Sequence, residues 1–389
     1  MQEDFHYYAT YCAACMAGYT HRESLDICYS AQLVDLCSRT FLTKIHGPLS
    51  AATTQLQLEL MDAGSDIISL QDITRIWASF HFLPYDLYAV KKRCFRRYLN
   101  KYRLICDVNG DLVCNTVELA KDRSLQAVGL AMHVLADTWA HRYFAGTPSL
   151  VINNTNDFFY ELLPEKDGYR ERHITFRHRP TAPDNIEKGL YTGTVVQSGE
   201  NSVMSLGHGR AGHLPDYCFM RYKYMPSWDD YNIRVKDNPS DYLNAFCQMI
   251  YAMKYLRGEY TGFEKGCYDT DAVRPWIDEI TGILNKRQPD ASDDWRALGE
   301  KLSGCSVPAF DIGRYQSEYI ICPEKKKNET FLGKFINAAL RQKSMVTHEI
   351  FRSGNILAGI SIDFKENGFK GIKDYRELIE DIKSGKGND

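Results

Sequence analysis

Apolar residues recur at helical spacing along most of this chain. Two such stretches open it, FHYYATYCAACMAG at 5–18 and HRESLDICYSAQLVDLCSRT at 21–40. An amphipathic stretch with a basic face, LYAVKKRCFRRYLNKYRL, occupies 87–104. Helical patterns return from residue 241 onward, for example in FLGKFINAALRQKSMVTHEIF at 331–351. The pattern therefore predicts a mainly α fold.

The helical pattern is interrupted in the middle of the chain. Short β-like runs, HITFRH and LYTGTVV, alternate with polar loops, so we expect a minor β and loop insertion around 150–205. We expect residues 1–260 to form a helical core domain. We expect residues 261–389 to form a helical C-terminal extension that packs on this core, with a frayed tail from about 380.

The longest helix is predicted from about 116 to 145. Asn115 and Glu118 have the spacing of a capping box that would begin it. The preceding segment also fits a calcium loop at positions 1, 3, 5, 9 and 12, occupied by Asp107, Asn109, Asp111, Asn115 and Glu118. Position 6 of that loop needs glycine for its sharp turn and is Leu112 here. We therefore favour the capping box over Ca²⁺.

Composition narrows the classes of protein. The chain has 389 residues, of which 44% are hydrophobic and 25% charged, as is typical of globular proteins. The net charge of −3 provides no global positive field for nucleic acid or anionic membranes, although a local groove could still bind them. No run of about 18 apolar residues occurs, so we expect no transmembrane segment.

The twelve cysteines bear on the cellular compartment. Several occupy apolar positions of helical stretches, which favours buried reduced thiols in a cytoplasmic protein. The opening MQEDFHYYATY lacks the basic and apolar regions of a signal peptide. Cys12 and Cys15 form a CxxC pair, but no second pair follows at zinc-ribbon spacing. We therefore expect cytoplasmic thiols without a redox or zinc role.

A polar stripe lies in the apolar stretch AMHVLADTWAHRYFAG at 131–146. His133, Asp137 and His141 are spaced i, i+4 and i+8, which places them on one helix face. A buried carboxylate costs several kcal/mol unless it is paired or ligated. Neutral imidazoles and an ionised carboxylate are zinc ligands, and an i, i+4 pair can bind one ion. We prefer a metal site here to a satisfied polar core.

Further histidines and aspartates occur in similar contexts. They are His6 with Asp4 in EDFHYY, Asp35 in AQLVDLC, His81 in SFHFLP, and His208, His213 and Asp216 in GHGRAGHLPDY. Each alone is more often a core residue than a ligand. Trp139, Tyr143 and Phe144 lie near the stripe, and we prefer core packing for them over lining the mouth of a site.

The stretch LQAVGLAMHVLADTWAH resembles the central metal helix of the zinc-dependent phospholipase C and single-strand-specific nuclease superfamily. Those proteins are α-helical bundles whose three-zinc cluster hydrolyses phosphodiesters. The resemblance assigns ligand positions to His6, Asp35 and His81, and matches GHGRAGHLPD to a late pair of a histidine and an acid. A closer resemblance, over about 1–260, is to uncharacterised bacterial proteins that share DFHYYATY, HFLP, MHVxADTWAH and GHxxxGHxPD.

Two ligand assignments stay open within this resemblance. Secreted members of the superfamily use an amino-terminal tryptophan as a ligand, whereas this chain opens with Met1, and Asp4 could substitute. The spacing from His213 to Asp216 is tighter than in the superfamily, so His208 is an alternative ligand. We expect two or three ions.

The ligand set constrains the metal and the reaction. Histidines and carboxylates without thiolates suit Zn²⁺, with Fe or Mn as lesser candidates. We expect Asp137 to bridge ions and Asp35 to ligate or to accept a proton from the attacking water, in a zinc-dependent hydrolase of phosphodiesters. The substrate would be a small-molecule or lipid phosphodiester, with nucleic acid not excluded. The alternatives are a non-catalytic metal-stabilised helical binding or structural protein and a metallohydrolase acting on esters or amides.

Overall fold

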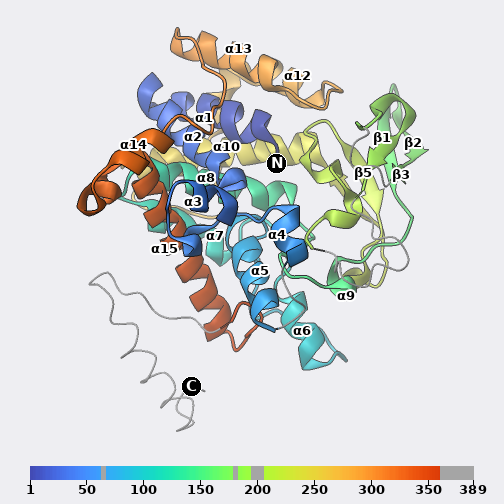
Figure 1. The fold of residues 1–389 in the computed structure, drawn as a ribbon. Coiled ribbons are helices and arrows are strands. Elements are labelled where there is room, and N and C mark those ends of the chain that lie inside the picture. The colour runs from blue at the N-terminus through green and yellow to red at the C-terminus, as the bar shows by residue number, and fades with distance from the viewer. Residues whose placement is uncertain (63–66, 178–182, 194–205, 360–389) are drawn as a thin grey trace.

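The computed structural model describes residues 1–62, 67–177, 183–193 and 206–359. Within these ranges the chain is mainly helical, as predicted, with a small β region to one side (Figure 1). The expected frayed tail lies outside the described residues, as do parts of HITFRH and LYTGTVV.

Helices occupy both ends of the described chain, and its strands lie between residues 160 and 237. The helices are α1 (Thr10–Met16), α2 (His21–Leu36), α3 (Arg39–Lys44), α4 (Gln57–Asp62), α5 (Ile67–Phe80), α6 (Arg96–Tyr102), α7 (Asp111–Ala120), α8 (Leu125–Ala140), α9 (Leu150–Asn153), α10 (Asn238–Leu256), α11 (Thr270–Val273), α12 (Ile277–Asn285), α13 (Ser292–Ser303), α14 (Gln316–Ile321) and α15 (Phe331–Arg352). The strands are β1 (Tyr160–Glu165), β2 (Gly168–His173), β3 (Thr175–Arg177), β4 (Leu190–Thr192), β5 (Arg221–Tyr224) and β6 (Arg234–Asp237).

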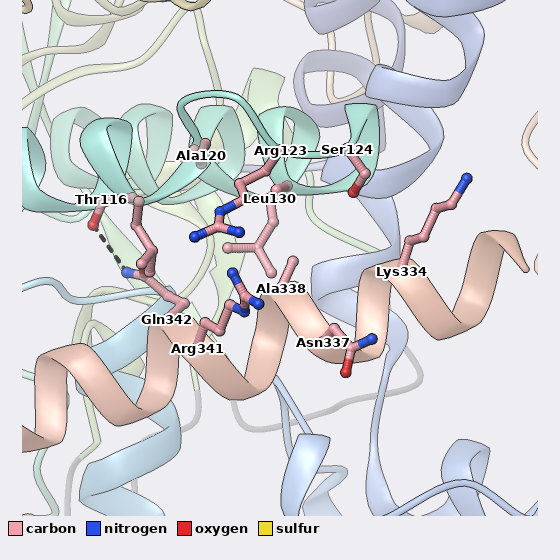
Figure 2. Close-up of a pocket in the computed structure, with 13 residues that line it drawn as sticks. Thr116, Ala120, Arg123, Ser124, Leu130, Lys334, Asn337, Ala338, Arg341 and Gln342 are labelled. Atoms are coloured by element: carbon pink, nitrogen blue, oxygen red, sulfur yellow. Dashed lines mark hydrogen bonds between the residues drawn. The ribbon is translucent and has the colours of Figure 1, made fainter. Parts of the chain in front are cut away.

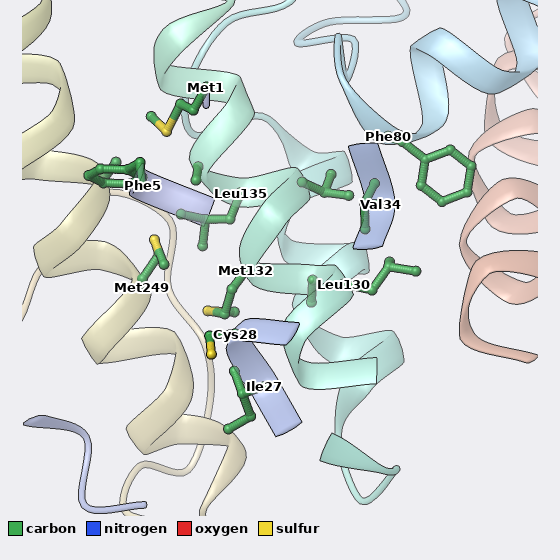
Figure 3. Close-up of a cluster of buried hydrophobic side chains, with 14 of the residues drawn as sticks. Met1, Phe5, Ile27, Cys28, Val34, Phe80, Leu130, Met132, Leu135 and Met249 are labelled. Carbon is green, nitrogen blue, oxygen red and sulfur yellow. The ribbon is translucent and has the colours of Figure 1, made fainter. Parts of the chain in front are cut away.

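Helix α8 lies at the centre of the fold. Nearly all of its side chains are buried, and it packs against α2, α10, α7 and α15. Figure 3 shows its apolar side chains meeting those of α2 and α10, namely Leu130, Met132 and Leu135 with Ile27, Cys28, Val34 and Met249. The polar stripe predicted on this helix is therefore inside the protein.

Close approach of α2 to α8 depends on Gly129. A Cβ atom at this position would lie 2.1 Å from the carbonyl oxygen of Ile27 and 2.7 Å from Cβ of Ser30. Backbone oxygen cannot move aside as a flexible side chain can, so only glycine allows the two helices this separation.

We expect Gly129→Ala to lower stability by about 1–3 kcal/mol, because the added methyl group overpacks the α2–α8 contact. Thermal unfolding should show a melting temperature several degrees lower. Gly282→Ala is the matched control, since a Cβ there meets no atom within 4 Å and alanine favours a helix. Equal melting temperatures for the two variants would contradict this account of the crossing.

The predicted single helix over 116–145 is wrong. Two helices occupy this region, α7 and α8, and the chain between 121 and 124 turns from one into the other. The proposed capping box is also wrong, because α7 begins at Asp111 with Gly110 as its N-cap. Asn115 and Glu118 therefore lie inside α7, and Glu118 accepts a hydrogen bond from the Tyr255 hydroxyl instead.

The oxygens of the calcium-loop pattern have protein partners. Asp107 pairs with Arg142, and Asp111 pairs with Lys265. The side-chain oxygen of Asn109, Oδ1, accepts a hydrogen bond from Gln248 Nε2 at 2.6 Å. These contacts tie the segment to α10 and its neighbours.

The β region follows α9 and extends further along the chain than predicted. Strands β2, β1, β5 and β6 form an antiparallel sheet in that order, and β3 and β4 form a separate parallel pair. The sheet thus includes residues up to 237, beyond the expected limit of 205. Buried aromatic rings, including Phe144, Phe159, Tyr222 and Tyr224, form a second core beside it.

Helices from the C-terminal part pack on the N-terminal part. Helix α13 lies against the π-helical turn Asp4–Ala9, and α15 lies against α5 and α8. Helices that follow residue 260 therefore contact elements that precede it, while the division into a core domain and an extension stays a prediction. No helix of the described residues is long and apolar enough to cross a membrane.

Candidate metal centre

Histidines and aspartates from distant parts of the sequence meet at the C-terminal half of α8. His6 comes from the π-helical turn, Asp35 from the last turn of α2, and His81 from the residue after α5. The loop at 207–216 supplies His208 and Asp216, the latter at the end of a 3₁₀ turn. Among the residues that the structure describes, three groups could hold a metal ion: His6, His133 and Asp137; Asp35, His81 and His133; and His141, His208 and Asp216.

Asp137 stands at the centre of the cluster, with its two carboxylate oxygens facing different partners. Its Oδ1 accepts from the Met1 amino group at 2.9 Å and lies 3.1 Å from His6 Nε2. Its Oδ2 lies 3.1 Å from His81 Nδ1 and 3.2 Å from His133 Nε2. A carboxylate placed in this way has the geometry to bridge two ions.

Asp35 lies on the more open side of the cluster, with its side chain 28% exposed. Its oxygens are 3.7 Å from His81 Nδ1, 3.9 Å from His6 Nε2 and 3.9 Å from His133 Nε2. These separations are too long for hydrogen bonds, and they leave room for an atom between the groups.

The third group includes the amino group of Met1. His141 Nε2 lies 3.2 Å from Asp216 Oδ1, and His208 Nε2 lies 3.6 Å from Asp216 Oδ2. The Met1 nitrogen is 3.3 Å from Asp216 Oδ1 and 3.4 Å from His141 Nε2. It is also the link to Asp137, so this nitrogen joins the third group to the first.

Backbone carbonyls orient three of the imidazole rings. His81 Nε2 lies 3.1 Å from the Thr53 oxygen, His141 Nδ1 2.7 Å from the His81 oxygen, and His208 Nδ1 2.8 Å from the Gly212 oxygen. A carbonyl only accepts, so each of these nitrogens carries the proton. In the neutral rings the opposite nitrogens therefore direct lone pairs at the carboxylates. Ring orientation by an outer carbonyl is typical of metal-binding histidines.

This arrangement places the unprotonated imidazole nitrogens, which are hydrogen-bond acceptors, opposite carboxylate oxygens, which are also acceptors. With neutral imidazoles, His81 Nδ1 faces Asp137 Oδ2, and His141 Nε2 faces Asp216 Oδ1, with no proton between either pair. Two facing lone pairs at such distances repel unless a cation or a donor lies among them. The Met1 amino group lies beside His141 and Asp216, and His133 Nε2 lies 3.3 Å from His81 Nδ1. The histidine nitrogens and carboxylate oxygens are close enough together to hold metal ions.

Burial keeps several of these imidazoles neutral. It lowers the pKa of His133 and of His208 to about 4, and together with the neighbouring His133 it lowers the pKa of His6 to about 4. Burial alone would also lower the pKa of the Met1 amino group, but Asp137, Asp216 and Asp35 raise it to about 11. Neutral histidines are the form that binds metal.

Burial and neighbouring charges also shift the pKa values of the carboxyl groups. Burial alone would raise the pKa of Asp137, but His141, the Met1 amino group and His133 hold it well below its usual value. Asp216 is likewise held low against burial, chiefly by His208 and the Met1 amino group. The carboxyl groups of Asp137 and Asp216 are therefore held ionised although they are buried.

Two predicted ligands lie apart from these groups. Asp4 is buried, and its oxygens accept from the backbone N–H groups of Phe5 at 2.8 Å and Ala291 at 3.1 Å. His213 has a side chain 54% exposed, with Nδ1 3.6 Å from Asp216 Oδ2. His208 is the histidine that the loop brings to His141 and Asp216, whereas Asp4 fastens the N-terminal turn to the start of α13.

Phe82 packs against the third group. Its ring stacks on His141 with centroids 4.7 Å apart. A Cβ on Gly207 would lie 2.1 Å from Phe82 Cζ, and this residue has a φ of +54°, so glycine is needed to bring the His208 loop over the ring. Trp139 instead donates to Gln248 at 2.9 Å, and Phe144 belongs to the second core, as the preference for core packing predicted.

Helix α15 braces the carbonyls around His81. Gln342 Nε2 donates to the Ser79 oxygen at 3.1 Å, two residues before His81. Lys343 Nζ donates to the Ser50 oxygen at 2.6 Å and also to the Ala52 oxygen, next to Thr53, whose carbonyl holds the His81 ring. The C-terminal helix therefore fixes both ends of the hydrogen bond that orients this ligand.

The Met1 amino group is a neighbour of the cluster that the sequence reasoning missed. No side-chain pattern marks a backbone nitrogen as a ligand. The available signal was the resemblance itself, in which an amino-terminal residue is a ligand.

A separate pocket of about 140 Å³ lies between α7, α8 and α15. Figure 2 shows Arg123 and Arg341 pointing toward each other across it, above Leu130. None of the residues in the three histidine and aspartate groups lines this pocket. It is therefore distinct from the candidate metal centre.

By its fold and donor set, this is a helical protein with a buried histidine and aspartate cluster that could hold metal ions. The chain belongs to a family of unknown function, DUF6765, which matches residues 1–350. No curated protein and no solved structure matches the chain. Family membership thus extends beyond residue 260, the limit that the shared motifs indicated.

Proposed function

We propose that this protein is a zinc-dependent hydrolase that cleaves phosphodiester bonds. The observation that carries the proposal is the convergence of histidine nitrogens on carboxylate oxygens, with the opposite ring nitrogens of His81, His141 and His208 donating to backbone carbonyls. A set of imidazole and carboxylate ligands suits Zn²⁺, with Fe or Mn as alternatives.

The three groups define the ion positions that we propose. The first ion would be held by His6, His133 and Asp137, the second by Asp35, His81 and the second oxygen of Asp137, and the third by His141, His208, Asp216 and the Met1 amino group. Loss of a proton from the Met1 amino group would accompany binding at the third position.

The chemistry follows from the ligand set. Zinc bound at such a cluster supplies a nucleophilic water near neutral pH and a Lewis acid for the phosphoryl oxygens. Asp35, on the open side, is placed to accept the proton of the attacking water. Asp137 is buried with both oxygens engaged, so its role is to fix the positions of the ions relative to one another.

Phosphodiesters are favoured over other substrates by the resemblance of the α8 stretch to the phospholipase C and nuclease superfamily. We also propose that the helices form a bundle like that of the superfamily. The proposed substrate is a lipid or small-molecule phosphodiester. The twelve cysteines are all free, which supports our expectation of a cytoplasmic protein.

Two alternatives rest on the same cluster. In one, the ions are coordinatively closed and only support a helical binding or structural protein. The exposed side chain of Asp35 favours an ion with an open coordination position. Catalysis needs such a position for water or substrate, so the exposure favours a catalytic role. In the other, the activated water attacks esters or amides, which the donor set does not distinguish from phosphodiesters.

Elemental analysis followed by a substrate panel tests the proposal. We expect two or three zinc ions per chain in the purified protein, and hydrolysis of an aryl phosphodiester in preference to a phosphomonoester, an ester and an amide. Fewer than about 0.2 ions per chain after incubation with each metal would overturn the metal centre. A full complement of ions without hydrolysis of any substrate would favour the structural alternative.

A further inference from the structure

A second surface, remote in sequence from most of the cluster, combines exposed apolar and cationic side chains. It includes α6 and the loop before it, where Phe95 is 87% and Val90 is 80% exposed. Tyr85 and Tyr88 are exposed nearby. Apolar side chains this exposed are normal singly, but a group of them marks an interaction site.

Cations surround these apolar side chains. Lys92, Arg93, Arg96 and Arg97 are exposed, and none of them makes an ion pair within the described ranges. Burial and then the nearby Arg97 lower the pKa of Lys101, a sign that positive charge is crowded here. The acidic neighbours are Asp86 and Asp230, and Asp230 is paired with Lys91. The surface is therefore locally positive on a chain whose net charge is −3.

Neighbouring segments extend the same surface. Helix α9 packs beside α6 and exposes Leu150 and Val151 (Figure 1). Lys91 Nζ donates to the Trp228 oxygen at 2.5 Å, and Ser227 Oγ donates to the Val151 oxygen at 2.7 Å. These bonds join the loop before α6, α9 and the turn at 227–229 into one surface, which we call the basic apolar surface.

We propose that the basic apolar surface binds an anionic lipid membrane. Peripheral binding needs apolar side chains that enter the interface and cations that meet the headgroups, and this surface presents both together. The attraction to anionic lipid is worth about a fivefold gain in binding per cation near the surface. Phe95 and Val90 would enter the interface, with Arg96 and Arg97 at headgroup level.

The side chains favour lipid over single-stranded nucleic acid. Nucleic-acid surfaces stack bases on aromatic rings. Here Lys91 Nζ lies 5.6 Å and 5.5 Å from the ring centroids of Tyr98 and Tyr102 and covers one face of each, which leaves Phe95, Tyr85 and Tyr88 as the exposed rings. Val90, Leu150 and Val151 offer no stacking face, whereas aliphatic side chains partition into a membrane interface. The inference rests on this surface alone and holds whether or not the metal centre hydrolyses phosphodiesters.

Co-sedimentation of the full chain with vesicles tests the proposal. One vesicle set is pure phosphatidylcholine, and the other contains phosphatidylglycerol as well. The variants are Phe95→Ser, which removes the exposed ring, and Arg96→Glu with Arg97→Glu. The matched controls are Ile321→Ser, also a highly exposed apolar residue, and Lys325→Glu with Lys326→Glu, which changes the net charge by the same amount.

We expect binding to the anionic vesicles that weakens with salt, falls at least about tenfold in the Arg96 and Arg97 variant, and is unchanged in both controls. Melting temperatures should match across the set, because all the substituted side chains are exposed. No binding to anionic vesicles would overturn the proposal, as would equal losses in variant and control. Binding of a single-stranded oligonucleotide but not of vesicles would overturn it as well. Stripping metal with a chelator should leave vesicle binding intact.

Discussion

Asp137→Asn is expected to remove the ions that Asp137 would hold. Both carboxylate oxygens face histidines, and an amide would place an N–H₂ donor and a weaker acceptor where ions need two anionic oxygens. We expect at most about one ion per chain, at the third position, and at least about a hundredfold loss of phosphodiester hydrolysis. The melting temperature should fall too, since bound metal stabilises only the folded chain.

Metal content by mass spectrometry and thermal unfolding measure this effect together. His348→Ala and His21→Ala are the controls, because neither residue belongs to a histidine and aspartate group of the described chain. Both controls should keep the full complement of ions. An Asp137→Asn protein with unchanged metal content and melting temperature would refute the cluster.

Extending the chain by Gly-Ser before Met1 is expected to remove one ion selectively. The extension converts the Met1 amino group into a peptide N–H, which has no lone pair for a metal. It also forces extra residues into a place where Met1 is 7% exposed. We expect one ion fewer per chain and a loss of hydrolysis of about a hundredfold, while the ions on Asp137 remain.

Native mass spectrometry can count the ions in the extended protein, and the same Gly-Ser pair added after the last residue is the control. A protein extended at the N-terminus that keeps every ion and full hydrolysis would exclude the Met1 nitrogen from the ligand set. Loss of all ions would show that the N-terminal turn, with His6, depends on the free chain end.

The helical character and the central stripe could be predicted because both are local. The i, i+4 spacing of His133 and Asp137 sets a shared helix face whatever surrounds it. The break between α7 and α8 could not, since Asn115 and Glu118 satisfy capping spacing equally well inside a helix. His208 and His213 could not be separated by spacing, because two short 3₁₀ turns and Gly207 decide which ring also reaches His141.

The hydrogen bonds that α15 makes near His81 bear on whether this protein can be truncated. The proposed ligands lie before residue 217, which makes the first 260 residues look like a self-sufficient metalloprotein. Yet the backbone beside Thr53, the outer partner of His81, is anchored by Lys343 of α15 through the Ser50 and Ala52 carbonyls. A fragment cut at 260 would keep the ligand but free its ring to turn, so the second coordination shell, and with it the affinity of the site, belongs to the whole chain.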